Sequence, residues 1–379
     1  MRIAIFTDTF PPDVNGVARI LSHYTDYLEQ KNIDYMVFAP NHKSSEPFSN
    51  HINRFMSFPF FLYPECRLAL PNFFKIKAKL KSFRPDIIHI VTPFNIGICG
   101  LRYAKKYDVP VVGSYHTKFD QYLAYYDLQF LSKFFWKYMR WFYRHLEMTY
   151  VPSRDTMEQL QRMGFTRMDV WGSGVDCDLF HPDYDKEHVR QQYQIEEPYI
   201  LSYVGRLAPE KEVDTLMKIA HSLPEETKKK VHWLITGDGP SREEMEKSAS
   251  ANMTFTGYLD GQDLARVYAA SDLFIFPSVT ETFGNVVLEA LASGTPVIAA
   301  KAGGVQNIIQ DGKTGILCEP RQISRFVEAI QSLLNNEELR LEMAHQARSY
   351  ALTQTWEIIF DTLLAHYEYV LHERNILYA

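Results

Sequence analysis

Two glutamates with seven residues between them, Glu281 and Glu289, mark the stretch of this sequence best suited to chemistry. An apolar run ending at Pro277 precedes them, as expected of a buried parallel strand, and a helical pattern carries the second glutamate. Gly284 lies where the loop enters that helix, whose free N–H groups and partial positive charge suit a phosphate. Acidic residues beside such turns typically bind ribose hydroxyls, so the stretch predicts a nucleotide site at the carboxyl end of a parallel sheet.

Two cations in an earlier loop favour the same interpretation. Arg206 and Lys211 follow an apolar strand that ends at Gly205. In a loop between a strand and a helix they can reach one anion, with Arg offering a planar fork and Lys a compact charge. Taken alone, the cations would be solvated surface charges, and the two glutamates would be ordinary charges at a helix start and on its surface.

Four more candidates follow predicted strands at the edge where open α/β sheets bind ligands, namely Gly16, His116, Gly237 and Tyr258. Gly16 precedes a predicted helix from about Val17 to Gln30, which is a weak phosphate-site signal, since a structural turn explains it equally well. A lone histidine is more often structural than catalytic. Backbone groups and an aromatic ring near Gly237 and Tyr258 could hold a base, although simple turns also explain them.

Composition limits the class of protein. A chain of 379 residues with 46% hydrophobic residues predicts two domains with well-buried cores, and its net charge of −6 argues against nucleic acid as the main partner. The four cysteines show no metal-ligand spacing and are typical of reduced thiols. No signal peptide and no apolar run of about 20 residues is evident, so we expect a soluble cytoplasmic protein.

Short apolar runs alternate with helical patterns along the whole chain, which predicts an α/β fold with doubly wound parallel sheets. Strands are expected at 2–7, Tyr35–Ala39, Ile87–Val91, Val111–Tyr115 and Met148–Pro152 in the first half. A run rich in glycine and proline predicts a linker near residues 172–195.

The spacing of Glu281 and Glu289, with Phe283-Gly284 between them and Ala302-Gly303-Gly304 after them, resembles the signature of retaining GT-B glycosyltransferases of family four. The resemblance covers almost the whole chain and implies two Rossmann-like domains that face each other across a cleft. It assigns residues 1–175 to acceptor binding and 195–355 to the nucleotide-sugar, and residues 356–379 form a helix that crosses back to the first domain.

The resemblance also assigns roles to single residues. It makes His116 and Glu281 catalytic, with Glu281 on the sugar hydroxyls, Glu289 on the ribose, and Arg206 and Lys211 on the diphosphate. The donor-binding residues that it implies are Gly16, Arg206, Lys211, Gly237, Tyr258, Glu281, Thr282, Phe283, Gly284, Asn285 and Glu289. Many family members have two glycines where this chain has Asn15-Gly16. We expect no cofactor and no metal, because no Asp-x-Asp element is placed as a metal site.

Two stretches combine aromatic and basic residues, 55–84 and 118–146. Cations that meet anionic headgroups and rings that lie at the polar–apolar boundary suit an interfacial membrane surface. The alternative is that the rings fill the core and the bases are its solvated edge, and the sequence supports the two interpretations equally. Binding would place the protein on the inner face of the cell membrane.

The first 170 residues resemble sulfoquinovosyl diacylglycerol synthases and GDP-mannose-dependent α-mannosyltransferases, on the basis of Asp86-Ile-Ile-His89, Ser114-Tyr-His-Thr117 and Val151-Pro-Ser153. The expected function is therefore transfer of a hexosyl group from GDP-mannose or a UDP-hexose to a glycolipid or diacylglycerol. A soluble or polysaccharide acceptor, a GT-B epimerase or phosphorylase, and a nucleotide-sugar sensor remain alternatives. The sequence does not predict the base, the sugar, the linkage or the oligomeric state.

Overall fold

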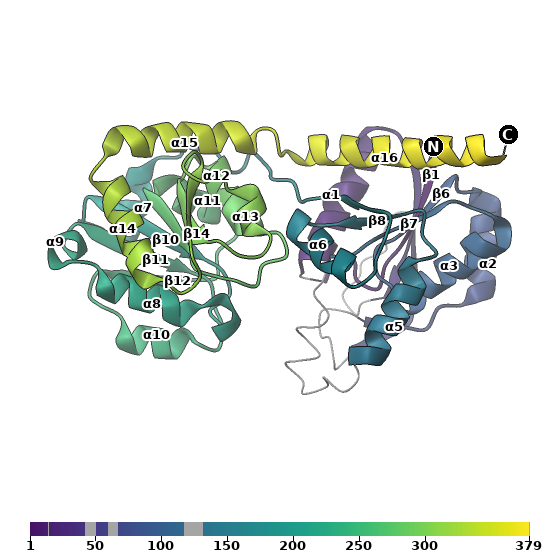
Figure 1. The fold of residues 1–379 in the computed structure, drawn as a ribbon, viewed down its shortest axis with the longest axis horizontal. Helices are drawn as coiled ribbons and strands as arrows, with labels where there is room; N and C mark the ends of the chain where they lie inside the picture. The colour runs from purple at the N-terminus through teal and green to yellow at the C-terminus, as the bar shows by residue number, and fades with distance from the viewer. Residues whose placement is uncertain (14, 42–50, 60–66, 117–131, 379) are drawn as a thin grey trace. The chain divides into compact units, whose positions relative to one another are not determined.

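The computed structural model describes residues 1–13, 15–41, 51–59, 67–116 and 132–378 (Figure 1). The chain divides into two compact units. The first contains Met1–Gly172 and Ile359–Ala379, and the second contains Ser173–Ile358. Each unit is built on its own parallel sheet with its own apolar core, as the alternation of strands and helices predicts.

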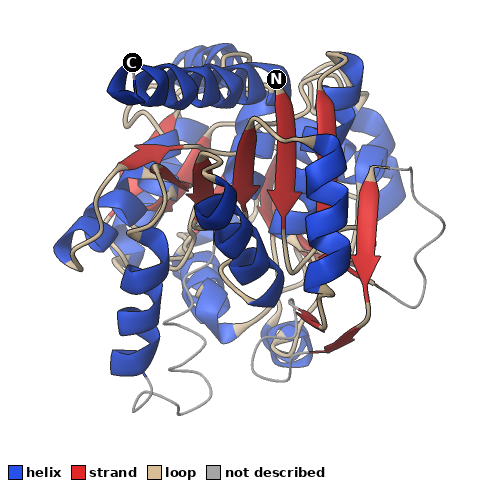
Figure 2. Cartoon of the chain, turned by 90° about the vertical axis from the view of Figure 1, so that its right-hand side faces the viewer, coloured by secondary structure: helices blue, strands red, loops and turns tan. Residues whose placement is uncertain are grey.

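The first unit contains a seven-stranded sheet in the order β3-β2-β1-β6-β7-β8-β9, with every neighbouring pair parallel. Figure 2 shows strands of this sheet running side by side in one direction. The order reverses between β1 and β6, which makes that position the switch point where such sheets bind ligands. The strands are β1 Arg2–Phe6, β2 Asp34–Pro40, β3 Ile52–Phe55, β6 Ile87–Ile90, β7 Val111–Ser114, β8 Met148–Val151 and β9 Met168–Val170.

The helices of this unit are α1 Gly16–Gln30, α2 Phe73–Phe83, α3 Asn95–Tyr107, α5 Ser132–Tyr143, α6 Arg154–Arg162 and most of α16 Trp356–Tyr378. A two-stranded antiparallel ribbon, β4 Ser57–Pro59 and β5 Arg67–Ala69, precedes α2. Asn15 caps α1 by accepting a hydrogen bond from the Ala18 N–H at 2.9 Å. Asn15 therefore has a structural role as an N-cap where many family members have a glycine.

Most of the C-terminal helix α16 belongs to the first unit. Tyr27 of α1 donates a hydrogen bond to Asp361, and the Tyr367 hydroxyl lies 2.5 Å from Nδ1 of buried His89 on β6. Phe360, Leu363 and Tyr367 are fully buried, so the helix completes the core of this unit. Among the helices that the structure describes, none has the length and apolar character needed to cross a membrane.

The second unit contains a six-stranded parallel sheet in the order β12-β11-β10-β13-β14-β15, with its switch point between β10 and β13. Its strands are β10 Tyr199–Val204, β11 Val231–Thr236, β12 Met253–Gly257, β13 Leu273–Phe276, β14 Val297–Ala300 and β15 Gly315–Cys318. Its helices are α7 Lys186–Tyr193, α8 Val213–Ser222, α9 Glu225–Lys228, α10 Arg242–Ser248, α11 Gly261–Ala270, α12 Asn285–Ala292, α13 Val305–Ile308, α14 Ile323–Leu334 and α15 Glu337–Ala351.

The second unit begins at Ser173, earlier than the residue 195 expected from the sequence. Arg348 of α15 explains the difference, because its guanidinium donates to the carbonyl oxygens of Cys177 at 3.1 Å and Phe180 at 2.7 Å. Val175 also forms a bridge with Thr355. These contacts fix the segment rich in glycine and proline onto the second core, and its later part forms α7.

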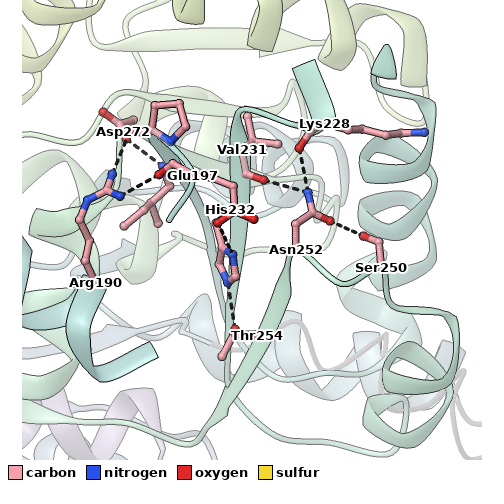
Figure 3. A network of polar contacts seen from close by, with 11 residues as sticks. Arg190, Glu197, Lys228, Val231, His232, Ser250, Asn252, Thr254 and Asp272 are labelled. Atoms are coloured by element: carbon pink, nitrogen blue, oxygen red, sulfur yellow. Dashed lines mark hydrogen bonds and ion pairs between the residues drawn. The ribbon is translucent and has the colours of Figure 1, made fainter. Parts of the chain in front are cut away.

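A polar network near the amino ends of β11 and β12 is structural (Figure 3). His232 lies 3.0 Å from Glu197 through Nδ1 and 2.9 Å from Thr254 through Nε2, and burial lowers the pKa of His232 against the opposing effect of Glu197. Asn252 donates to the carbonyl oxygens of Lys228 and Val231. Both nitrogens of His232 have partners and the network lies at the edge opposite the ligand-binding one, so it stabilises the fold.

A buried carboxylate forms hydrogen bonds at the switch point of the first sheet. Asp8 follows β1 and accepts hydrogen bonds from the Thr92 hydroxyl at 2.8 Å and from the Ile96 N–H of α3 at 3.2 Å. Burial raises the pKa of Asp8 to about 7, although these hydrogen bonds act in the opposite direction. The carboxyl group thus joins β1 to the start of α3 and titrates near neutral pH.

We expect Asp8 to make stability depend on pH. The folded protein binds the Asp8 carboxyl proton more tightly than the unfolded chain does. The stability that this proton adds is therefore fully present below about pH 4 and is lost as the pH rises through about 7. Asp8→Asn removes this titration and should flatten the dependence of the urea midpoint on pH between 5 and 8. The exposed Asp178→Asn is the control, and parallel profiles for Asp8→Asn and the wild type would contradict the expectation.

Candidate active site

The loops at the switch point of the second sheet carry most of the residues singled out in the sequence. Arg206 and Lys211 lie in the loop after β10, and Glu281–Asn285 occupy the loop after β13 and the start of α12. Since β10 and β13 are neighbouring parallel strands, their carboxyl ends present both loops at the same edge. The structure therefore brings the predicted diphosphate-binding and sugar-binding residues together.

An ion pair joins the two loops directly. The Lys211 ammonium, at the end of a 3₁₀ turn from Pro209 to Lys211, donates to the Glu281 carboxylate. Only 24% of the Lys211 side chain and 17% of the Glu281 side chain are exposed. Thr280 adds a second link, because its hydroxyl donates to the Glu210 carbonyl oxygen at 2.9 Å. The pair places a cation and a carboxylate side by side for a ligand that has both phosphate and hydroxyl groups.

Two glycines after β14 allow the backbone of the Glu281 loop to pack closely against the chain there. A Cβ atom on Gly303 would lie 2.4 Å from the Glu281 carbonyl oxygen, and one on Gly304 would lie 2.2 Å from that of Thr282. The Gly304 N–H donates to the Glu281 carbonyl oxygen at 2.9 Å. The Ala-Gly-Gly element noted in the sequence is therefore explained by close backbone packing that holds the glutamate in place.

The start of α12 has the properties of an anion site. Gly284 precedes the helix with a φ of 107°, and no side chain caps the helix. Nearby, the buried Oδ1 of Asn285 has no hydrogen-bond partner in the described part of the protein. Free N–H groups at a helix start attract phosphate, and an unpaired buried acceptor is ready to receive a ligand hydroxyl. Both features favour a phosphorylated sugar as the ligand.

Glu289 lies on α12 with only 4% of its surface exposed. The Tyr268 hydroxyl of α11 donates to its Oε2 at 3.1 Å. This contact holds the buried carboxylate of α12 against α11. The assignment of Glu289 to the ribose stays a prediction.

The remaining predicted donor residues of this unit lie at the same edge but differ in exposure. Arg206 is largely exposed and lies 3.7 Å from Glu210, so its guanidinium is accessible to an anion. Gly237 has a φ of 133°, and a Cβ there would lie 1.9 Å from the Gly205 carbonyl oxygen. Tyr258 follows β12 and is 69% exposed, three strands away from β13.

Sequence reasoning missed Ser278. It is fully buried after β13, and its hydroxyl has no partner in the described residues. The available signal was a polar residue directly after a buried apolar strand, Leu273–Phe276, at a ligand-binding edge. The unpaired hydroxyl and the unpaired Asn285 oxygen lie on either side of the Glu281 loop in the sequence.

The other two predicted residues, Gly16 and His116, belong to the first unit. A Cβ on Gly16 would meet no atom within 4 Å, so the protein itself does not require glycine there. His116 follows β7, and its ring lies 5.1 Å from that of Trp171. Its Nε2 is buried without a partner in the described residues, and burial lowers the pKa of His116 to about 4. At neutral pH the imidazole is therefore neutral and can accept a hydrogen bond.

A buried hydrogen-bond chain supports the strand that leads to His116. His89 lies 2.5 Å from the Ser114 hydroxyl through Nε2 and 2.5 Å from the Tyr367 hydroxyl through Nδ1. Tyr143 donates to the Ser114 carbonyl oxygen at 2.7 Å. Burial lowers the pKa of His89 to about 3, so the ring is neutral, with one nitrogen donating and the other accepting. The C-terminal helix thereby helps to hold the end of β7.

Comparison with known protein families gives two matches that together span nearly the whole chain. The profile described as "Glycosyl transferases group 1" matches residues 185–350, and the profile described as "Glycosyltransferase Family 4" matches residues 14–179. The first covers the second sheet and its ligand-binding loops, and the second covers most of the first unit.

Three curated relatives are similar over most of their length. A GDP-mannose-dependent alpha-mannosyltransferase of Mycobacterium tuberculosis is 34% identical, with 99% of this chain and 98% of the relative covered. Sulfoquinovosyl transferase SQD2 of Arabidopsis thaliana is 33% identical over 94% of this chain and 71% of its own. Alpha-monoglucosyldiacylglycerol synthase of Streptococcus pneumoniae is 32% identical, with 84% of this chain and 75% of the relative covered.

Solved structures are similar in fold. Sucrose-phosphate synthase from Thermosynechococcus elongatus has a TM-score of 0.77 at 20% identity, covering 98% of this chain and 100% of that one. HepE from Anabaena, solved in complex with UDP, has a TM-score of 0.78 at 18% identity, covering 97% of this chain and 100% of HepE. Their two-domain GT-B architecture agrees with the fold class predicted from the sequence.

Lys211→Ala should weaken the binding of UDP or GDP, because it removes a cation at the anion site. Loss of a charge-assisted hydrogen bond of about 1.5–3 kcal/mol corresponds to a roughly 10–100-fold rise in Kd, measured by calorimetry. Lys229→Ala, which changes an exposed lysine paired with Glu226, is the matched control. Equal affinity of the Lys211→Ala variant and the wild type for the nucleotide would show that Lys211 does not contribute to nucleotide binding.

Tyr367→Phe should destabilise the first unit by about 1–3 kcal/mol, because it leaves the buried Nδ1 of His89 without its partner. The control is Tyr369→Phe on the same helix, where the hydroxyl belongs to an exposed side chain. Denaturant unfolding of the two variants measures the difference. Identical midpoints would show that the His89 contact contributes no stability.

Proposed function

Because the chain belongs to the group 1 glycosyl transferases, we propose that it moves a hexosyl group from a nucleoside-diphospho-sugar to a membrane lipid hydroxyl with retention of configuration. The glycosyltransferase activity follows from the family. The proposal adds the donor, GDP-mannose or a UDP-hexose, the lipid acceptor and the stereochemistry. The observation that carries the donor part is the Lys211–Glu281 pair beside the start of α12.

The chemical requirement is departure of a nucleoside diphosphate while the sugar develops positive charge. Negative charge grows on the leaving phosphate, and stabilising it is the main electrostatic task. Lys211, Arg206 and the N–H groups at the start of α12 supply positive charge at one edge of the sheet. We propose that these groups perform the task without a metal ion.

Glu281 and its neighbours would orient the sugar. Its carboxylate binds sugar hydroxyls when a phosphate engages Lys211, and Asn285 and the loop backbone at Thr282 and Phe283 bind the remaining groups. Glu289 binds the ribose, and Gly237 and Tyr258 flank the base. On the first unit, we propose that His116 is catalytic and, as a neutral imidazole, accepts a hydrogen bond from a substrate hydroxyl, consistent with its lowered pKa.

The lipid acceptor is supported by the similarity to alpha-monoglucosyldiacylglycerol synthase of Streptococcus pneumoniae, an enzyme named for a glycolipid product. The surface of the first unit adds physical support. Phe74 on α2 is 82% exposed and Phe134 on α5 is 74% exposed, among exposed lysines of both helices. Large exposed rings beside cations suit the interface of an anionic bilayer.

The aromatic stretches divide between core and solvent. Met139, Phe142 and Tyr143 of α5 are buried, whereas Phe134 and Trp141 are exposed. The cations Lys133, Lys137 and Arg140 line a groove of about 440 Å³ around Trp136 on the same helix. Residues 118–131 and Phe60, Phe61 and Glu65, which also belong to the two basic aromatic stretches, lie outside the described residues, as does Thr117.

A donor screen with purified protein tests the proposal. We expect UDP or GDP to be released from one donor among UDP-glucose, UDP-galactose, UDP-N-acetylglucosamine, UDP-sulfoquinovose and GDP-mannose. Release should require anionic liposomes that contain diacylglycerol or glycolipid, and EDTA should not reduce it. NMR of the product should show the donor's anomeric configuration.

Each part of the proposal has its own contradicting result. Release that stops with EDTA would overturn metal independence. Transfer to a soluble or polysaccharide acceptor, with no effect of liposomes, would overturn the lipid acceptor. Donor binding without transfer to any acceptor would favour a sensor, and conversion of the donor without an acceptor would favour an epimerase.

Glu281→Gln separates charge from shape at the proposed reaction centre. The variant keeps a hydrogen-bonding side chain but removes the carboxylate that neutralises Lys211. We expect UDP or GDP to bind at least as tightly as to the wild type, while the rate of transfer falls at least about 100-fold. An unchanged rate of transfer would show that Glu281 takes no part in the reaction. Loss of nucleotide binding would show instead that the Glu281 carboxylate is needed for the structure of the site.

A further inference from the structure

A second groove, outside the loops described above, lies in the first unit. It has a volume of about 610 Å³, within the roughly 300–1,000 Å³ typical of ligand pockets. One wall is the connection from β5 to α2, and the other is the outer face of α3. Its lining residues are Ala69, Leu70, Pro71, Asn72, Phe73, Asn95, Ile98, Cys99 and Arg102.

Helix α3 presents one face to the groove because the opposite face is pressed onto the sheet. A Cβ on Gly97 would lie 2.1 Å from the Thr92 carbonyl oxygen, and one on Gly100 would lie 2.8 Å from the Phe6 ring. These glycines therefore fix the rotation of the helix. Its lining residues Asn95, Ile98, Cys99 and Arg102 recur at the spacing of a single helical face on the other side.

The lining divides into an apolar part and a cationic part. Leu70, Pro71, Phe73 and Ile98 form the apolar part, and none of the described lining residues is acidic. Arg102 is exposed and forms no ion pair within the described part of the chain. A ligand that satisfies both parts has an apolar chain and an anionic head.

The groove continues into an exposed apolar surface on the β4–β5 ribbon. Phe58 and Leu68 form a cross-strand pair whose side chains are exposed, and Met56 and Leu70 beside them are exposed too. The Arg67 N–H of the ribbon donates to the Asp8 carbonyl oxygen at 3.2 Å, which places the ribbon against the end of β1 at the switch point. Contiguous exposed apolar residues on a soluble surface indicate contact with a membrane or partner.

We propose that this groove binds one anionic phospholipid from the bilayer, with an acyl chain along Leu70, Phe73 and Ile98 and the phosphate on Arg102. The choice of a bilayer lipid rests on the proposed membrane acceptor. The exposed ribbon face lies in the interfacial region of the bilayer and delivers the lipid to the groove. Binding of this lipid holds the first unit on the membrane surface that contains the acceptor.

Photo-crosslinking tests the groove directly. The probe is phosphatidylglycerol with a diazirine in one acyl chain, mixed into phosphatidylcholine vesicles, and mass spectrometry of the full chain locates the adducts. We expect adducts within residues 69–73 and 95–102. Arg102→Gln should reduce them at least about fivefold, whereas Lys106→Gln, an exposed cation of α3 outside the groove, should leave them unchanged.

A second variant and a competitor make the result decisive. Ile98→Trp fills the apolar part and should also reduce the adducts, with circular dichroism confirming that the variant folds. Excess glycerol phosphate should not displace the probe, because the acyl chain supplies much of the binding. Adducts confined to other segments, adducts insensitive to both variants, or full displacement by glycerol phosphate would each overturn the proposal.

The outcome is separable from that of the proposed function. Crosslinking uses no donor and no acceptor, so adducts in the groove without any transferase activity would support the lipid site while the proposed reaction fails. Transfer to a lipid with no groove adducts would support the reaction and overturn this lipid site.

Discussion

The contact between Lys211 and Glu281 is the interaction on which the candidate site depends. It joins the loops after β10 and β13, which are 70 residues apart in sequence but adjacent at the switch point. Exposed ion pairs contribute little stability, about 0–1 kcal/mol, but this pair is largely buried, so each partner compensates the other's desolvation. Under the proposed function, a diphosphate that attracts Lys211 would free the Glu281 carboxylate for sugar hydroxyls, and the ion pair already holds the two groups side by side.

Close backbone packing gives this pair its fixed position. Gly303 and Gly304 lie against the Glu281 loop, and Gly237 lies against Gly205 in the loop after β10. Any side chain at these positions would collide with a carbonyl oxygen, so the loops cannot approach without glycine. The glycines that accompany the charged residues in the sequence therefore have a packing role, and the charged residues would lose their geometry without them.

The fold followed from the sequence because its signals are local. Apolar runs such as Ile87–Val91 became strands, here β6 Ile87–Ile90, and the pattern from Val17 to Gln30 became α1. Local pattern and family resemblance together identified Lys211 and Glu281, but their pairing is a tertiary contact that spacing does not encode. The three-residue strands β4 and β5 have too few residues for a period to appear, and the assignment of residues 173–195 to the second unit depends on the distant Arg348. Whether the site residues contact donor or acceptor stays a prediction.

Helix phase explains why sequence could not decide between a core and a membrane role for the aromatic stretches. On α5, exposed Trp141 is followed immediately by buried Phe142, because one residue turns the helix by about 100° and moves the ring from solvent to core. Amino-acid composition does not distinguish the two rings, whereas in the folded helix one faces solvent and the other faces the core. The same helix places Lys133, Lys137 and Arg140 together on its outer side. The core interpretation thus holds for the buried rings of α5, and the membrane role of the exposed rings stays a prediction.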